Sequence, residues 1–174
     1  MTAAGPAPVT PAIDVLVEAG DWPDEAALHA LVSAAVAAAV AAAAPRLTPS
    51  AEVSLVFTDD AHVRTLNARY RKKDTATNVL SFPAPQMTPN AFGPLLGDLV
   101  LAQETVTGEA ATAGLSLDHH LTHLVVHGFL HLLSYDHETE EEAAVMEGLE
   151  TAILAALGIA DPYADPPADR MTRG

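Results

Sequence analysis

Short runs in which apolar and polar residues alternate predict four β-strands in the first two thirds of the chain. We expect these strands at residues 13–18, 52–58, 77–82 and 95–104. Apolar residues spaced three and four apart predict five helices, at residues 26–44, 59 to about 70, a short one ending at 114, 117–133, and 139 to about 158. This order predicts one domain of the mixed α/β (α+β) class, in which about five helices pack on a small four-stranded mixed sheet.

Local signals at the ends of the predicted elements support these boundaries. Pro45 ends the first helix, Asp59 suits the N-cap of the second, and Thr139 with Glu142 forms a capping box for the last. We expect loose tails at residues 1–11 and 161–174 around a domain that spans 12–160. Residues 83–94 hold four prolines and one glycine, which indicates a loop and a candidate lid over a functional site.

The apolar run of residues 26–44 is the one candidate in the sequence for a membrane span. It consists mostly of alanine, which is nearly neutral on transfer into lipid, and His29 and Ser33 interrupt it. Its larger apolar residues share one helical face, which favours a helix packed on a protein core: Leu28, Leu31, Val32, Val36, Ala39 and Val40. The first eleven residues lack the basic and apolar regions of a signal peptide, so we expect no targeting segment and no membrane partner.

Composition narrows the possible functions. The chain has 174 residues, of which 49% are hydrophobic, and this is enough for a sizeable core. Eight Lys and Arg against 23 Asp and Glu give a formal net charge of −15, which disfavours non-specific binding of nucleic acid over the whole surface. The chain has no cysteine, which excludes disulfides, cysteine-based zinc sites, iron–sulfur clusters and thiol catalysis.

Six of the eight histidines lie between residues 119 and 137. At about 100° per residue on a helical wheel, five of them fall within an arc of about 120°. These five are His119, His120, His123, His127 and His131, and the opposite side carries Leu121, Leu124, Val125, Phe129 and Leu132. The predicted helix therefore has an imidazole face and an apolar face.

The last three histidines have the spacing of metal ligands. His127 and His131 lie one helical turn apart, and His137 joins them only if the helix ends near Ser134 and the chain folds back. Metzincin proteases share this spacing, but their general base is a Glu directly after the first histidine, where this chain has Gly128. Three imidazoles with an open fourth position suit a catalytic zinc ion, and the alternative is a histidine-rich solvated helix face.

Charge is distributed unevenly along the chain. Five of the eight cationic residues lie within ten positions: Arg64, Arg69, Arg71, Lys72 and Lys73. Such a patch on an acidic protein would guide a polyanion to one place, and the alternative is a solvated turn. Seven acidic residues between Asp136 and Glu150 are expected to form a solvated face of the last helix.

Three segments carry a resemblance to a known family: residues 66–83 (LNARYRKKDTATNVLSFP), 96–100 (LGDLV) and 127–137 (HGFLHLLSYDH). In this order and spacing they closely resemble the bacterial YbeY family, an rRNA maturation factor and endoribonuclease. The resemblance extends from about Val53 to Met146, and the last string is close to diagnostic. The chain departs from the family pattern at Ser134 and Ala76, where Gly and Pro are common. A left-handed turn at Ser134 would destabilise the fold by about 1 kcal/mol.

The resemblance implies a zinc-dependent endoribonuclease of the cytoplasm, with one Zn²⁺ per chain and single-stranded RNA as substrate. The family matures ribosomal RNA, chiefly the 3′ end of the small-subunit RNA, and acts in ribosome quality control. The implied partners are therefore single-stranded rRNA and the small ribosomal subunit or its proteins, and we expect no dinucleotide cofactor. His127, His131 and His137 match the family's metal ligands, and Arg71 matches an invariant arginine that faces the metal.

These matches suggest roles for neighbouring residues. Arg71 is expected to clamp the scissile phosphate. Flanking phosphates would be bound by three further cations, Arg69, Lys72 and Lys73. His123 and His120 are either proton carriers or, as we favour, groups that support the metal ligands. Asp136 either orients an imidazole N–H or caps the turn. Candidate groove residues on the third strand are Thr77, Asn78 and Ser81.

Two other classes of function stay open at this point. A metal-dependent peptidase would share the ligand spacing, but the chain lacks a Glu after His127. A non-catalytic ribosome-assembly factor would use zinc as a structural ion. Structural zinc sites usually have four ligands, often cysteines, whereas only three ligands are evident here.

Overall fold

The computed structural model describes residues 9–163. Its elements follow the predicted order, with boundaries within two residues of those expected: β1 (Ala12–Val17), α1 (Glu25–Ala43), β2 (Glu52–Thr58), α2 (Asp60–Arg71), β3 (Val79–Pro83), β4 (Leu95–Ala102), α3 (Gln103–Ala113), α4 (Leu117–Leu132) and α5 (Glu140–Ala156). The tails are predicted at residues 1–11 and 161–174. Residues 1–8 and 164–174, which make up most of them, lie outside the described residues. Asp161 accepts a hydrogen bond of 3.1 Å from Thr151, which extends the packed part of the chain beyond α5.

The four strands form one mixed sheet in the order β1-β2-β4-β3. β1, β2 and β4 are parallel, and β3 is antiparallel to β4. The predicted fold class is confirmed. Residues that alternate along β2 and β4, namely Val53, Leu55, Phe57, Leu99 and Leu101, are buried in the main core.

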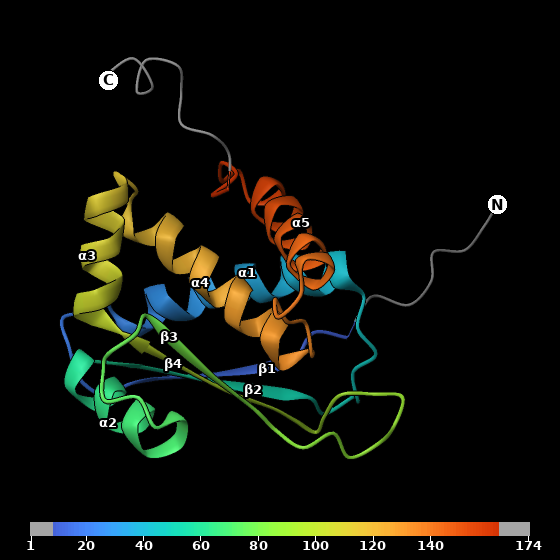
Figure 1. Cartoon of the computed structure of the whole chain (residues 1–174). Coiled ribbons are helices and arrows are strands. Elements are labelled where there is room, and N and C mark those ends of the chain that lie inside the picture. The colour runs from blue at the N-terminus through green and yellow to red at the C-terminus, as the bar shows by residue number, and fades with distance from the viewer. Residues whose placement is uncertain (1–8, 164–174) are drawn as a thin grey trace.

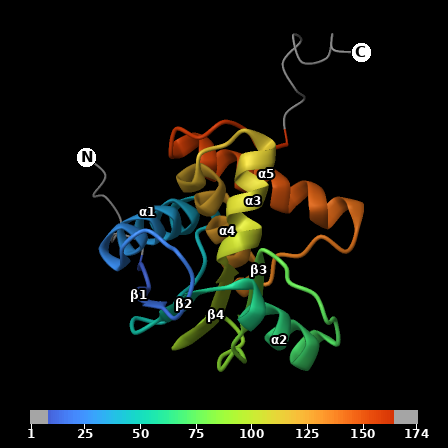
Figure 2. The ribbon, with the colours of Figure 1, turned by 90° about the vertical axis from the view of Figure 1, so that its left-hand side faces the viewer.

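Helices cover both faces of the sheet unequally. Figure 1 shows α1, α4 and α5 above the sheet and α2 below it, and Figure 2 shows α3 standing at one end of the sheet. The large core lies between the sheet and the three upper helices. A smaller cluster beneath the sheet joins Val63 of α2 to Leu80 of β3 and Val100 of β4. This second contact holds α2 against the sheet. The Tyr70 ring lies 5.6 Å from the Phe82 ring and places the C-terminal end of α2 beside β3.

Among the described residues, α1 is the one helix long and apolar enough to cross a membrane, by length and composition alone. Its predicted face packs into the main core, where Leu28, Val32, Val36 and Val40 are at most 2% exposed. Leu31 is half-buried against the same core. The helix therefore packs through the residues that its spacing predicts.

The loop predicted at residues 83–94 as a candidate lid lies against the segment before β2. Its Phe92 exchanges backbone hydrogen bonds with Arg46 and Thr48, at 2.8 and 2.9 Å. Those bonds tie the loop to the segment before β2. Pro83, the first residue of the predicted loop, ends β3 and lines the histidine cleft described below, whereas residues 84–94 do not line it.

Candidate metal centre

Helix α4 presents the histidine face as the wheel predicts, except at His119. Ser116 caps the helix by accepting a hydrogen bond from the His119 N–H at 3.1 Å. His119 itself is exposed and does not line the cleft. The remaining four histidines of the face, His120, His123, His127 and His131, are partly buried and line one cavity of about 950 Å³.

The chain reverses after α4, as the ligand spacing requires. Ser134 has a φ of 75°, the left-handed conformation that glycine usually adopts at this place in a helix end. The N–H of Tyr135 donates to the Leu130 carbonyl at 3.1 Å and so closes the turn. Asp136 accepts a hydrogen bond from the His137 N–H at 2.8 Å, so its carboxylate caps the turn. Within residues 9–163 no imidazole donates to Asp136.

The turn brings His137 back to His127 and His131. One ring nitrogen from each of the three histidines lies within 4.8 Å of the others. The Nε2 atoms of His127 and His131 are 3.1 Å apart. Metal–nitrogen bonds of 2.0–2.1 Å at a tetrahedral zinc ion would separate two ligand nitrogens by about 3.3 Å, so these residues fit such an ion.

The chemistry of the three histidines also favours metal binding. Burial, followed by the neighbouring His127 and His137 rings, lowers the pKa of His131 below its usual value. The neutral form of imidazole is the form that binds a metal. Imidazoles accept zinc, copper and nickel, so the cluster can hold one divalent cation of this group.

The acidic pattern of the last helix predicts a solvated position for Glu150, but the structure buries this residue of α5. The whole residue is 0% exposed. One carboxylate oxygen, Oε1, lies 2.7 Å from His123 Nε2, 3.3 Å from His127 Nδ1, and accepts from the Tyr163 hydroxyl at 2.9 Å. Burial by itself would raise the pKa of Glu150, but the bonds from His123, His127 and Tyr163 lower it to about 2.

A signal for Glu150 does exist in the sequence. It follows Met146 by four residues and precedes Ile153 and Leu154, all of which are buried. A carboxylate in the apolar stripe of an amphipathic helix needs a partner inside the protein. The other acidic residues of α5, such as Glu141 and Glu147, are exposed, so the predicted solvated face is correct for them.

A second carboxylate supports His120. Glu109 of α3 lies 2.9 Å from His120 Nε2 and accepts a hydrogen bond of 3.0 Å from the Asn78 side chain. The Asn78 oxygen accepts from the Val79 N–H at 2.7 Å. This network joins α3, α4 and the start of β3 across one end of the cleft.

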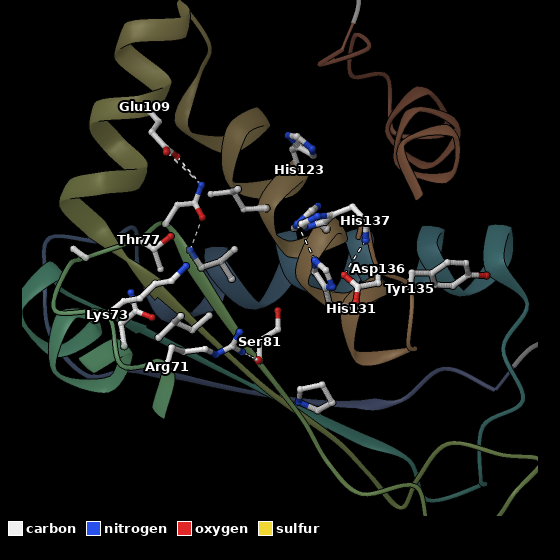
Figure 3. Close-up of a pocket in the computed structure, with 18 of the residues that line it drawn as sticks. Arg71, Lys73, Thr77, Ser81, Glu109, His123, His131, Tyr135, Asp136 and His137 are labelled. Carbon is white, nitrogen blue, oxygen red and sulfur yellow. Dashed lines mark hydrogen bonds between the residues drawn. The ribbon is translucent and has the colours of Figure 1, made fainter. Parts of the chain in front are cut away.

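The wall opposite the histidines carries the predicted arginine. Figure 3 shows Arg71 and Ser81 on one side of the cleft and His131 and His137 on the other. Arg71 donates to the Ser81 carbonyl, and its guanidinium lies 5.6 Å from the centre of the Phe82 ring. Among residues 9–163 this is the one hydrogen bond of that guanidinium, so further N–H donors of Arg71 are available to a ligand.

Of the other three cations predicted to bind phosphate, one lines the cleft and two do not. Lys73 lines the cleft together with Arg71. Lys72 and Arg69 do not line it: Lys72 ends α2 with a φ of 58°, and Arg69 lies 5.3 Å from the centre of the Tyr70 ring. Arg64, also part of the cationic segment, pairs with Asp74 at 2.8 Å. The candidate groove residues of the third strand, Thr77, Asn78 and Ser81, all line the cleft.

Gly128 faces the sheet and not the cleft. A Cβ atom at this position would lie 2.9 Å from a methyl group of Leu99 and 3.4 Å from the Ser81 hydroxyl. A side chain at the position that carries the general base in metzincin peptidases would therefore have to displace the buried Leu99 side chain. This observation argues against the peptidase alternative.

Comparisons with known proteins agree with one another. Residues 19–158 match the family model described as Endoribonuclease YbeY. The chain is 53% identical over 161 residues to Endoribonuclease YbeY of Rhizobium meliloti, covering 89% of this chain and 96% of the relative. It is 52% identical over 157 residues to Endoribonuclease YbeY of Allorhizobium ampelinum, covering 87% and 94%.

The fold is also similar to a solved structure. The solution structure of TM1509 from Thermotoga maritima superposes with a TM-score of 0.53 at 20% identity. The match covers 88% of this chain and 99% of the other. At this identity the likeness concerns the fold.

Proposed function

The chain belongs to the YbeY family of endoribonucleases, and from this premise we propose that it cleaves single-stranded RNA with the help of a zinc ion. The substrate that we propose is ribosomal RNA, chiefly the 3′ end of the small-subunit RNA, during maturation and ribosome quality control in the cytoplasm. The proposed partners are the small ribosomal subunit or its proteins. One observation carries the proposal: Arg71 and Lys73 line the same cleft as the three clustered histidines.

In this proposal His127, His131 and His137 hold the zinc ion. When bound, zinc would supply a Lewis acid to the phosphodiester group that is cut. The guanidinium of Arg71 binds the scissile phosphate from the opposite wall and stabilises the charge that grows on it. Lys73 binds a neighbouring phosphate, a contact that positions the strand without selecting its sequence.

Polar groups of β3 and of the segment just before it form the floor along which the RNA lies. Asn78 is held by Glu109, and the Ser81 carbonyl holds Arg71, so both groups have a fixed direction toward the cleft. Such fixed hydrogen-bonding groups lower the reorganisation needed when a substrate binds. The acidic exposed face of α5 repels RNA from the remainder of the surface.

Cleavage of a labelled single-stranded fragment from the 3′ end of small-subunit rRNA tests the proposal. A His131→Ala protein, purified identically, reports contaminating nucleases. Cleavage by the wild type alone supports the proposed enzyme. Equal cleavage by both proteins would identify a contaminant, and no cleavage by either would favour a non-catalytic ribosome-assembly factor.

A further inference from the structure

Glu150 is a buried carboxylate that contacts a metal ligand without facing the cleft. It lies on α5 with 0% exposure and does not line the cavity. Its nearest neighbours come from α4 and from the segment after α5. It therefore stands behind the metal centre, away from any substrate.

Three polar groups converge on one oxygen of this carboxylate. Glu150 Oε1 accepts from the Tyr163 hydroxyl at 2.9 Å and lies near His123 Nε2 and His127 Nδ1, at 2.7 and 3.3 Å. The other oxygen, Oε2, has no hydrogen-bond partner among the described residues. An ionised carboxylate only accepts hydrogen bonds, so the imidazole nitrogens that face Oε1 are the ones that carry the protons.

This arrangement determines which nitrogen of His127 faces the other ligands. A neutral imidazole with its proton on Nδ1 has its lone pair on Nε2. The Nε2 atom of His127 is the atom that lies 3.1 Å from His131 Nε2, inside the histidine cluster. The hydrogen bond to Glu150 thus selects the tautomer and the ring orientation that a metal requires.

We propose that Glu150 is a positioning residue of the metal centre, which holds His127 with Nε2 directed at His131 and His137. His123 and Tyr163 in turn hold the carboxylate, so residues from two helices and the C-terminal segment fix one imidazole. The inference deepens the proposed function and rests on its metal centre.

The alternative is that Glu150 only fills space in the core. A buried carboxylate is a poor filler, because its transfer from water is unfavourable unless its partners compensate. An apolar residue of similar shape would fill the same space without that disadvantage. Glu150→Met separates the two roles, because it keeps the volume and removes the acceptor.

The test measures zinc affinity and the tautomer of His127. Competition with a chromophoric chelator gives the zinc dissociation constant, and ¹⁵N NMR of the metal-free protein shows which nitrogen of His127 is protonated. We expect Glu150→Met to bind zinc about 10- to 100-fold more weakly and to lose the Nδ1–H tautomer. Glu150→Gln keeps a weaker, neutral acceptor, so its zinc affinity should lie between those of the wild type and Glu150→Met. Glu147→Gln removes the same charge from an exposed position of α5 and should match the wild type.

Each outcome decides the inference. Wild-type zinc affinity and an unchanged tautomer in Glu150→Met would overturn it. If that variant does not fold, Glu150→Gln carries the test, and wild-type affinity in Glu150→Gln would equally overturn the inference. A wild type that binds no zinc would instead contradict the metal part of the proposed function, while the tautomer of the metal-free protein still tests the role of Glu150.

Discussion

The two walls of the cleft are built in different ways. On the histidine wall, His123 and His127 share a fully buried carboxylate, and His120 contacts a second carboxylate from α3. On the cationic wall, Arg71 and Lys73 are exposed at the end of α2, and a hydrogen bond to the Ser81 carbonyl is the one described partner of the Arg71 guanidinium. One wall is fixed by partners from several elements, whereas the other offers long side chains to solvent.

This difference indicates what each wall requires. A metal ion needs its ligands within a few tenths of an ångström of ideal positions, which demands buried support. A phosphate chain is bound by charge, and exposed cations adapt to it with little specific support. Substitutions on the histidine wall should therefore abolish activity, while most substitutions on the cationic wall should weaken it by degrees.

The largest expected effect comes from His131→Ala. Loss of one of three ligands should remove bound zinc and lower RNA cleavage by about 10³-fold or more, because the Lewis acid is worth several kcal/mol. Metal content per chain and turnover of labelled RNA check both parts. His119→Ala is the matched control, since His119 lies on the same helix outside the cleft. Chelation of the wild type should reproduce the loss, and added zinc should reverse it.

Arg71→Ala should have the next largest effect. We expect turnover to fall about 10²- to 10³-fold while zinc content stays at the wild-type level, because this guanidinium acts on charge that develops during the reaction. Arg69→Ala removes an arginine from the same helix outside the cleft and should retain most of the turnover. Equal losses in the two variants would contradict the assignment of Arg71 to the active wall.

A smaller effect should distinguish the two adjacent lysines. Lys73→Ala should weaken RNA binding a few-fold and make the slope of log affinity against log salt less steep by about 0.7, the value for one phosphate contact on a single strand. Lys72 does not line the cleft, so Lys72→Ala should change the slope less. Fluorescence anisotropy at several salt concentrations measures the affinity and the salt slope of each variant. A larger change in slope for Lys72→Ala than for Lys73→Ala would contradict the assignment of the phosphate contact to Lys73.

The smallest expected effect concerns stability. Ser134→Gly relieves a left-handed conformation and should raise the free energy of unfolding by up to about 1 kcal/mol, part of which is offset by greater freedom of the unfolded chain. Urea denaturation of the metal-free protein measures the change. Ser134→Ala keeps the strain and serves as control, and zinc affinity should be the same in all three proteins.

Much of the architecture could be predicted because it depends on local patterns. The capping box of Thr139 and Glu142 and the turn that Ser134 makes are properties of a few adjacent residues, and the structure contains both. The clustering of His127, His131 and His137 likewise follows from helix geometry and one reversal of the chain.

The missed features depend on how distant elements pack. Glu150 belongs to a helix with many exposed acidic residues, and only the packing of α5 against α4 shows that it alone among them meets histidines inside the protein. The contact between Glu109 and His120 likewise depends on how α3 packs against α4. The loop of residues 84–94 has a lid-like composition, and its bonds to Arg46 and Thr48 could not be predicted from that composition.

The edge of the sheet at β3 has a further consequence for the choice of ligand. In an antiparallel pair, residues that bond to the neighbouring strand alternate with residues whose backbone groups face away from it. The backbones of Asn78 and Ala84 bond to the β4 side. The odd-numbered residues between them therefore face the open edge.

Each of those three outward positions has a backbone group that is occupied or missing. The Val79 N–H donates to the Asn78 side chain, the Ser81 carbonyl accepts from Arg71, and Pro83 has no N–H. An incoming polypeptide strand would find no continuous ladder to extend, which disfavours both peptide capture by strand addition and edge-to-edge aggregation. The edge beside the cleft is thus closed to a peptide backbone and remains open to a strand that is recognised by its charge.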